Sequence, residues 1–549
     1  MAAPKLRLVT STVGPVLAST GAAGPAQTVE AYNLGDGTLA LTLTVDKPSS
    51  AWLATTAGAA RPCQTTTAAA SCIPLQFTLN TAALSAGTYT GIVTVNDPKA
   101  VDSPQTITVT VRVGGIDAYV APGTVRDFPF MTNGQISWKT TTQDGGSWLN
   151  LAINGTGSFR FNIPYRIRFQ PPAGMAQGIY NGSAAITSSI PAETRTVPVT
   201  MRVTTQPIAQ PTTDRVRVRL AQGAPPLATG VALSNAGQGS LTVSAVSVSG
   251  LTGVTATSTA AGAVLNFDPG TQAAGFTTGS LTISTNAVNG PVIVPVDFEI
   301  VAKGAPVIAY QGVQDNAVFT PGDIVTPGDI MVVKGEQLSF DPLTLGKAAP
   351  LATQVGGATV LVNGAPAPMY YSSYGQLAFQ MPVEIPTGTA LVQVQRDGQT
   401  SNTVSVDVAA RAPRLLRINV GDYGAIQNQD FSLPMPVGAI PGIATHPAQA
   451  GDTLTIYAIG LGQTNPAVAT GQPAPSAEPF ARVTSPPTVR FGAGFSAINV
   501  EPLFTGLTPT YAGLYQVNVT IPDGLSKGNV DVTLDFAGAV SNTVQIAVQ

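Results

Sequence analysis

The single histidine, His446, is the first side chain to test for acid–base chemistry. It lies in the segment ATHPAQAGD, which we interpret as a solvated loop before a strand. A Ser-His-Asp hydrolase needs its serine on a strained turn, and the G-x-S-x-G pattern of such a turn is absent. We therefore expect no catalytic residue and predict that the chain is not an enzyme.

Paired carboxylates could hydrolyse glycosides if two of them faced each other across a cleft. The acids here are scattered, and most adjoin Gly or Pro, where Asp favours turns: Asp97, Asp268, Asp323, Asp329 and Asp452. The D-x-[DN]-x-[DN]-G spacing of a calcium loop is also missing, and the nearest cluster is Asn96, Asp97 and Asp102. We keep a glycan-active hydrolase as a weak alternative and expect neither metal nor cofactor.

The two cysteines, Cys63 and Cys72, are separated by eight residues in the polar stretch CQTTTAAASC. No third or fourth soft ligand lies nearby, so a metal site is not expected. We predict a disulfide that closes the tip of a hairpin, and two free thiols are the alternative.

Aromatic side chains could stack on sugar rings. Trp52 and Trp148 each precede a Leu in repeated segments, which favours a place in the core of a sandwich. Tyr370, Tyr371 and Tyr374 lie in the loop-rich MYYSSYGQ and are the candidate ligand-binding residues. Packing against a neighbouring domain is the alternative for these tyrosines.

The composition predicts an all-β secreted protein. The 549 residues include 57 Gly and 45 Pro, only 10% are charged, and the net charge is −3. This charge excludes a nucleic-acid partner, which needs a basic face, and no apolar run is long enough to span a membrane. The N-terminus MAAPKLRLVTSTVG lacks the apolar core of a signal peptide, which fits either a cytoplasmic protein or a mature exported form with an added Met. The low charge and the Thr/Ser-rich β composition favour the second, a secreted or cell-surface protein.

One repeat covers the first 300 residues or so. GTYTGIVTV (87–95), GIYNGSAAI (178–186) and GFTTGSLTI (275–283) share two glycines around an aromatic residue and then alternate, which indicates strands with one buried face. NLGDGTL (33–39) and NAGQGSL (235–241) share a predicted tight turn. The Trp-Leu pairs and these strands resemble the BACON family of bacterial immunoglobulin-like domains, a resemblance that implies an extracellular binding or spacer module.

A second repeat begins beyond Lys303. YGQLAFQMP (374–382) matches LYQVNVTIP (514–522), and SNTVSVDVA (401–409) matches SNTVQIAVQ (541–549), both at an offset of 140. The second copy carries an inserted proline-rich loop, QTNPAVATGQPAPSAEPF (463–480), which we expect either to bind a ligand or to lie on the adjacent domain.

This tail resembles the C-terminal domain of Solibacter-type secreted proteins, through TPGDIMVVKGEQL, GGATVLVNGAPAPMYYSSYGQLAFQMP and AGLYQVNVTIP. Its halves resemble IPT/TIG domains through Gly335 and the turn at Asn363-Gly364. The resemblance implies an exported protein and assigns no activity.

We therefore predict an elongated series of immunoglobulin-like β-sandwiches that touch end to end: 5–115, 116–204, 205–302, 304–410 and 411–549. The expected function is extracellular structure or adhesion, in which the partner is a second copy of the chain or a surface polysaccharide. Self-association into filaments or a surface layer is plausible because low-charge β domains expose strand edges. A carbohydrate-binding surface protein is the alternative.

Overall fold

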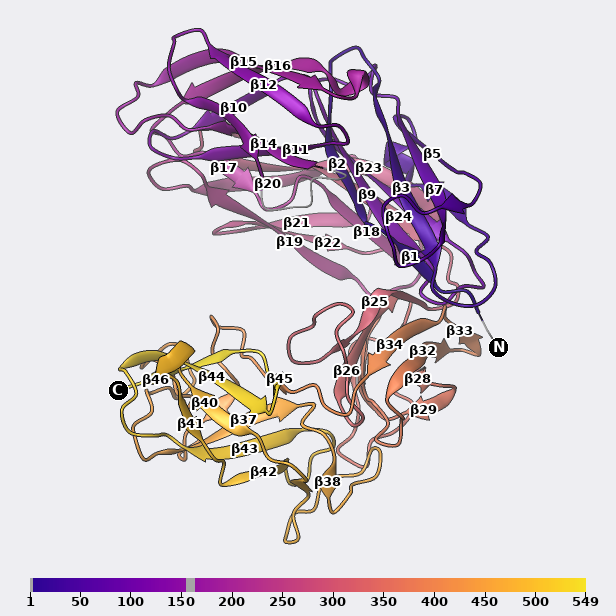
Figure 1. Cartoon of the computed structure of the whole chain (residues 1–549), viewed down its shortest axis with the longest axis vertical. Coiled ribbons are helices and arrows are strands. Elements are labelled where there is room, and N and C mark those ends of the chain that lie inside the picture. The colour runs from indigo at the N-terminus through magenta and orange to yellow at the C-terminus, as the bar shows by residue number, and fades with distance from the viewer. Residues whose placement is uncertain (1–2, 155–162) are drawn as a thin grey trace. The chain divides into compact units, whose positions relative to one another are not determined.

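The computed structural model describes residues 3–154 and 163–549, and these residues form an all-β protein of tandem immunoglobulin-like sandwiches (Figure 1). The described residues contain no α-helix; they include three single-turn 3-10 helices: η1 (Lys47–Ser49), η2 (Pro191–Glu193) and η3 (Gly494–Ser496). The chain divides into two compact units, 1–303 and 304–549. The sheets group into three sandwiches in the first unit and two in the second, numbered here in chain order.

Sandwich 1 packs the sheet β1-β3-β7-β5, with β6 beside β7, on the sheet β2-β9-β8-β4. Its strands are β1 (Leu6–Leu8), β2 (Thr12–Ala18), β3 (Gly24–Asn33), β4 (Thr42–Val45), β5 (Leu53–Ala57), β6 (Arg61–Pro62), β7 (Ser71–Leu79), β8 (Gly87–Asn96) and β9 (Gln105–Val113).

Sandwich 2 packs β10-β16-β15-β12 on β11-β14-β13. Its strands are β10 (Ile116–Val120), β11 (Arg126–Thr132), β12 (Ile136–Thr142), β13 (Leu149–Ile153), β14 (Ile163–Phe169), β15 (Gly178–Ser188) and β16 (Arg195–Val203). Sandwich 3 has the sheets β17-β19-β22-β21 and β18-β24-β23-β20. Its strands are β17 (Ala209–Pro211), β18 (Val216–Ala221), β19 (Leu227–Asn235), β20 (Val243–Ser249), β21 (Val254–Thr259), β22 (Gly262–Phe267), β23 (Gly275–Thr285) and β24 (Val292–Val301).

Sandwich 4 has the sheets β25-β26-β31-β30-β27 and β29-β28-β32-β33, with β34 beside β32. Its strands are β25 (Val307–Asp315), β26 (Ile330–Glu336), β27 (Thr344–Leu345), β28 (Ala358–Val362), β29 (Ala365–Ala367), β30 (Met369–Ser372), β31 (Gln376–Gln380), β32 (Gly388–Arg396), β33 (Gln399–Thr400) and β34 (Val404–Val408).

Sandwich 5 has the sheets β35-β37-β43-β42-β39-β38, with β36 beside β37, and β41-β40-β44-β45, with β46 beside β44. Its strands are β35 (Arg414–Leu415), β36 (Ile426–Gln427), β37 (Thr453–Ile459), β38 (Thr464–Asn465), β39 (Arg482–Val483), β40 (Thr488–Phe491), β41 (Ile498–Val500), β42 (Phe504–Leu507), β43 (Tyr515–Thr520), β44 (Gly528–Phe536), β45 (Ala539–Val540) and β46 (Val544–Val548).

The repeated Trp and Tyr of sandwiches 1 and 2 cap the core in the same way. Trp52 and Trp148 are buried, and each ring contacts the tyrosine of its own repeat, Tyr89 or Tyr180, at 6.5 Å between centroids. Each tyrosine hydroxyl donates to the carbonyl four residues upstream, at 3.1 Å in sandwich 1 and 3.0 Å in sandwich 2. The second glycine of the motif is needed for this packing, because a Cβ on Gly91 would lie 2.8 Å from Leu53.

The SNTV motifs of the tail hold equivalent strands together in both copies. Ser401 and Ser541 each accept a hydrogen bond from a backbone N–H seven residues earlier, at 2.9 Å. Asn402 pairs through both amide atoms with the backbone of Ile308, and Asn542 pairs in the same way with Leu415. The repeated sequence therefore builds a repeated contact between the segment just before the last strand of each sandwich and the first strand.

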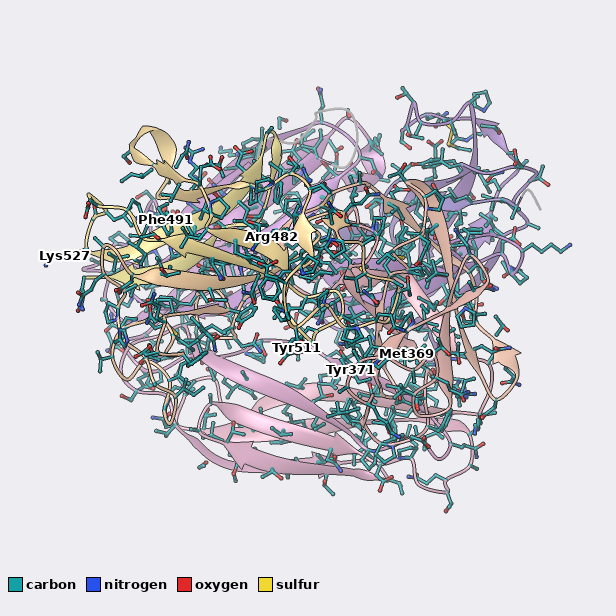
Figure 2. All side chains as sticks on the ribbon, turned by 90° about the horizontal axis from the view of Figure 1, so that it is seen from below. Met369, Tyr371, Arg482, Phe491, Tyr511 and Lys527 are labelled. Carbon is teal, nitrogen blue, oxygen red and sulfur yellow. A yellow bond between two sulfur atoms is a disulfide. The ribbon has the colours of Figure 1, made fainter. Side chains whose placement is uncertain are left out.

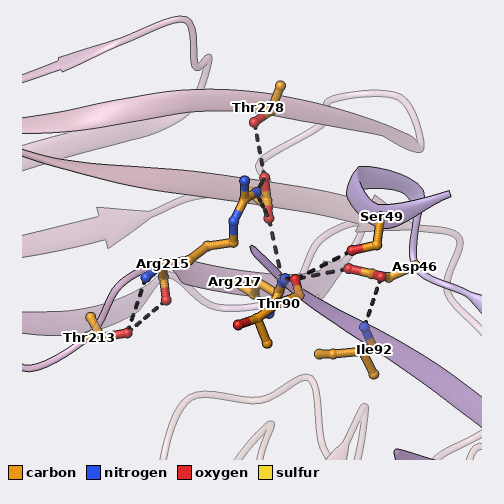
Figure 3. Close-up of polar contacts among 9 residues, drawn as sticks. Asp46, Ser49, Thr90, Ile92, Thr213, Arg215, Arg217 and Thr278 are labelled. Atoms are coloured by element: carbon orange, nitrogen blue, oxygen red, sulfur yellow. Dashed lines mark hydrogen bonds and ion pairs between the residues drawn. The ribbon is translucent and has the colours of Figure 1, made fainter. Parts of the chain in front are cut away.

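Sandwich 1 contacts both of the other sandwiches in its unit, so contacts there are not confined to sequence neighbours as an end-to-end series predicts. Leu17 on β2 packs into the core of sandwich 2, and its carbonyl accepts a hydrogen bond from Arg195. Arg217 on β18 donates to the carbonyl of Thr90 on β8, and its Nε lies 3.6 Å from the carboxylate of Asp46 (Figure 3). These contacts place partly buried cationic side chains between sandwiches, where they have carbonyl and carboxylate partners.

Candidate functional site

A groove with a volume of about 660 Å³ lies between sandwiches 4 and 5. Its wall on sandwich 4 comes from the turn before β26, from Gln380 at the end of β31, and from the segment after β31, which includes Glu384. Its wall on sandwich 5 comes from the start of the proline-rich loop, 462–469, and from Tyr515 on β43. The groove is the candidate binding site of the tail unit.

The polar side chains of the groove are held by the two sandwiches together. Buried Gln380 accepts a hydrogen bond from the N–H of Gly471 at 2.7 Å. The hydroxyl of Thr470 donates to the carboxylate of Glu384, and this bond lowers the pKa of Glu384 although partial burial opposes the shift. Tyr515 donates to the carbonyl of Gly462 at 2.6 Å, and burial raises its pKa. These hydrogen bonds fix the polar side chains that line the groove, and the raised pKa keeps the phenol of Tyr515 neutral.

The proline-rich loop lies against sandwich 4 over part of its length. The N–H of Val383 donates to the Thr470 hydroxyl at 2.9 Å, and the N–H of Leu351 donates to the carbonyl of Gly471 at 2.9 Å. The loop therefore lies on the adjacent sandwich, as one of the two expectations held, and its first residues line the groove. Ligand binding by the loop stays a prediction.

The three candidate tyrosines make three separate contacts. Tyr370 donates to the carbonyl of Ala512 in sandwich 5 at 2.7 Å, and burial raises its pKa. Tyr371 is half-buried, and its hydroxyl accepts a hydrogen bond from the Gln376 side chain (Figure 2). Tyr374 packs edge to face on Phe340, with 5.6 Å between ring centroids. Tyr370 thus packs against the neighbouring domain, and ligand binding by the trio stays a prediction.

Two acids are buried where sandwich 4 meets sandwich 5. Asp329 accepts a hydrogen bond from the N–H of Thr326 at 2.9 Å, and the backbone of Gly460 lies beside its other oxygen. Asp315 accepts from the N–H groups of Ala317 and Val318. Burial raises the pKa of Asp329 well above the usual range, and the charge of Asp315 adds to this effect. Asp329 therefore holds its proton to a higher pH than a solvent-exposed aspartate does.

The groove lacks the pair of acids that glycoside hydrolysis needs. Among the described lining residues, Glu384 is the one acid, and its carboxylate accepts a hydrogen bond from the Thr470 hydroxyl. His446 lies elsewhere, on an exposed loop, with its Nε2 3.1 Å from Asp430. A groove with one acid and several neutral donors and acceptors can bind a polar or sugar-like ligand, but it offers no acid–base pair.

The loop with Asn96, Asp97 and Asp102 uses its oxygens in protein contacts. Asp97 accepts from the N–H groups of Ala40 and Lys99, and Asp102 pairs with Arg7 at 2.6 Å. In the ranges that the structure describes, no three His, Cys, Asp or Glu side chains are placed to share a metal ion.

Cys63 and Cys72 form the predicted disulfide at the hairpin of β6 and β7. Buried Glu30 also holds this loop in place. It accepts hydrogen bonds from the N–H groups of Gln64 and Thr65, and it forms an ion pair with Arg61 at 2.8 Å. Burial opposes ionisation of Glu30, but the Thr65, Gln64 and Arg61 contacts outweigh it and lower its pKa.

The sequence predictions missed Gln380, Glu384, Tyr515 and the burial of Asp329. One signal for Tyr515 was present, because the offset of 140 aligns it with Gly375, and a tyrosine in place of a glycine marks a departure from the repeat. Asp329 corresponds to Asp452, and each accepts a backbone N–H from three residues upstream. Only contact with sandwich 5 makes Asp329 different, and this contact has no local sequence signal.

No family model matches the sequence, and no curated protein matches it. The solved structures that it resembles include titin I67–I69 at 13% identity, covering 55% of this chain and 100% of that one, with a TM-score of 0.14. Sidekick-1 immunoglobulin domains 1–5 match at 11% identity over 100% and 99% of the two chains, with a TM-score of 0.15.

An endo-fucoidan hydrolase of glycoside hydrolase family 107 also matches, at 14% identity and a TM-score of 0.15. That match covers 55% of this chain and only 44% of the enzyme. With TM-scores this low, none of these similarities supports a statement about function.

None of the helices in the described ranges has the length and apolar character needed to cross a bilayer.

Proposed function

We propose that this chain is a secreted or cell-surface structural protein that acts by adhesion and not by catalysis. The observation that carries the proposal is the interlocking of sandwiches 1–3 through Arg195, Arg217 and Leu17. Contacts of this kind between sandwiches make a unit of three sandwiches resist bending and separation, which is a property of a scaffold. The disulfide fits an oxidising compartment outside the cell.

The proposed partners are a second copy of the chain and a surface polysaccharide. The self-association proposal rests on the low charge of the chain and its free sheet edges. The polysaccharide alternative rests on the groove of sandwiches 4 and 5, whose fixed polar groups suit a hydroxyl-rich ligand. The resemblance to BACON-like and Solibacter-type secreted proteins is part of this proposal.

The test uses beads coated with the full chain. One sample contains these beads alone, and others contain beads that carry insoluble polysaccharides or no ligand. Clustering of the protein-coated beads supports self-association, and capture of polysaccharide beads supports the alternative. Absence of both would contradict adhesion, and release of reducing sugar from a polysaccharide would contradict a non-enzymatic role.

A further inference from the structure

An exposed apolar loop connects β36 to β37 in sandwich 5. From Phe431 to Ala444 its only polar side chain is that of Ser432, and it contains no charged residue. Phe431 is 79% exposed, Val437 80% and Ile443 51%. Phe431 and Val437 are the most exposed large apolar side chains among the residues that the structure describes. Exposed apolar groups gathered in this way mark a surface that binds a partner.

Hydrogen bonds fix the shape of this apolar loop (431–444). The N–H of Leu433 donates to the carbonyl of Ala444 at 3.0 Å, and the N–H of Gly438 donates to the hydroxyl of Thr445 at 2.9 Å. Phe431 has a φ of 65°, a left-handed conformation that a bulky residue adopts only when its surroundings hold it. The loop therefore presents its apolar side chains in one shape, which reduces the entropy lost when a partner binds.

The loop at the corresponding place in sandwich 4 already joins one sandwich to the next. It precedes Asp329 as the apolar loop precedes Asp452, and the turn at its end forms part of the groove wall. Asp323 of this loop pairs with Arg414 of sandwich 5 at 2.5 Å. The repeat thus uses this connection for contacts between sandwiches.

The groove between sandwiches 4 and 5 offers a surface that matches the apolar loop. Its volume of about 660 Å³ lies in the range of about 300–1,000 Å³ that holds a drug-sized ligand, which is the size of a short peptide. The described lining residues include one acid, Glu384, and no base. The apolar side chains of the lining include those of Val383, Pro386, Ala467, Val468 and Leu507.

The groove and the apolar loop lie at opposite ends of β37. Tyr515, which lines the groove, pairs with Ala458 near the last residue of this strand. The loop leads into the first residue, Thr453. The seven residues of β37 span about 20 Å, so the loop of one copy is placed to enter the groove of a second copy while its own groove stays open for a third.

We propose that the apolar loop of one copy binds in the groove of the next, an inference that rests on the proposed self-association. The occupant is a second copy because the chain itself supplies both halves of the contact, a fixed apolar loop without charge and an apolar groove with a single acid. A contact between two different surfaces is head to tail, and it extends into a filament unless the rotation between copies closes a ring. One loop buries a small area, so association is weak and needs high protein concentration.

The test measures sedimentation velocity of the full chain over a wide concentration range. Wild type is expected to form a series of oligomers. Val437→Asp in the loop and Ala467→Asp in the groove are each expected to raise the dissociation constant roughly tenfold, because each places a carboxylate in an apolar contact. Leu345→Asp is the matched control, since Leu345 is 73% exposed but lies in neither surface, and it is expected to associate as wild type does.

A mixture of the two variants gives the sharpest result. Val437→Asp keeps its groove and Ala467→Asp keeps its loop, so an equimolar mixture is expected to associate but to stop at dimers. A two-fold interface, in which both copies use the same surface, does not give this pattern. Circular dichroism of each variant shows that the fold is retained.

Three results would overturn the proposal. Wild-type association of both variants would overturn the contact and leave self-association standing. Loss of association in Val437→Asp alone would place the loop outside the groove. A wild-type chain that stays monomeric throughout would overturn both the contact and self-association. Flotation with phosphatidylcholine vesicles would then show whether the loop inserts into lipid, and the polysaccharide beads would show whether the groove binds a glycan.

Discussion

The guanidinium of Arg217 in sandwich 3 lies 3.6 Å from the carboxylate of Asp46 in sandwich 1, and the same side chain donates to the carbonyl of Thr90. Asp46 is itself fixed by the N–H of Ile92 at 2.9 Å. The contact joins two sandwiches that are separated by a whole domain in the sequence, so it couples their unfolding.

Arg217→Met is expected to weaken this coupling, because it removes the hydrogen bond from Arg217 to the Thr90 carbonyl and the positive charge beside the Asp46 carboxylate. The loss is expected to be about 2–4 kcal/mol. Differential scanning calorimetry should show one main transition of unit 1–303 splitting into two. Arg202→Met is the control, since Arg202 pairs with Asp117 on the surface within sandwich 2 and its loss is expected to cost less than about 1 kcal/mol. An unsplit transition in Arg217→Met would contradict the coupling.

Asp329 predicts an unusual dependence of stability on pH. Because folding raises the pKa of this carboxyl, the folded state holds the proton more tightly than the unfolded state. Its contribution is therefore fully present below the unfolded pKa, near 3.9, and stability falls as the pH rises toward the folded pKa.

Asp329→Asn is expected to remove this slope and to stabilise the tail unit at neutral pH, by about 1.4 kcal/mol for each unit of the pKa shift. Denaturant unfolding at pH 5 and pH 8 measures the effect. Asp452→Asn is the matched control, because Asp452 occupies the same turn of the repeat but is not buried. Equal effects of the two substitutions would show that the junction does not perturb Asp329.

His446 gives a direct spectroscopic test, because the chain has no other histidine. The carbonyl of Pro447 and the carboxylate of Asp430 raise the pKa of His446, while Ser432 and His446 lower the pKa of Asp430 to about 2. The pair therefore stabilises the loop below the usual histidine pKa, and this contribution is lost as the pH rises through the raised value. In an NMR titration, Asp430→Asn should lower the histidine pKa, and an unchanged midpoint would contradict the contact.

The disulfide closes a short loop, with a sequence separation of nine. Replacing both cysteines by serine is expected to cost about 2–3 kcal/mol through the freedom gained by the unfolded chain. Thermal unfolding of sandwich 1 measures this loss. Glu30→Gln tests the second contact on the same loop. Because loss of either contact weakens the other, combining the substitutions should cost less than the sum of the two separate losses.

The fold could be predicted because its signals are local. Alternation of apolar residues, the turn at Asn363-Gly364 and the matched SNTV motifs each depend on a few neighbouring residues. Both Asn363 and Gly364 have positive φ, as a tight hairpin turn requires. The burial of Trp52 and Trp148 in the cores of their sandwiches could be predicted from the same repeats.

The junctions could not be predicted because they depend on how separate sandwiches meet. Asp329 and Asp452 share their local sequence pattern, and only the neighbouring sandwich buries the first. Tyr370 was a candidate for an exposed sugar platform, but the carbonyl of Ala512, 142 residues away, accepts its hydroxyl. The groove arises from the same meeting of sandwiches, so its lining residues carried no common motif.

In each of the first three sandwiches an early strand runs parallel to the last one: β2 along β9, β10 along β16 and β18 along β24. Tension applied to the two ends of such a sandwich slides these strands past each other, so their hydrogen bonds must break together and not one after another. A chain that links two surfaces would then hold under load until a high force is reached, and would give way abruptly and not by gradual extension.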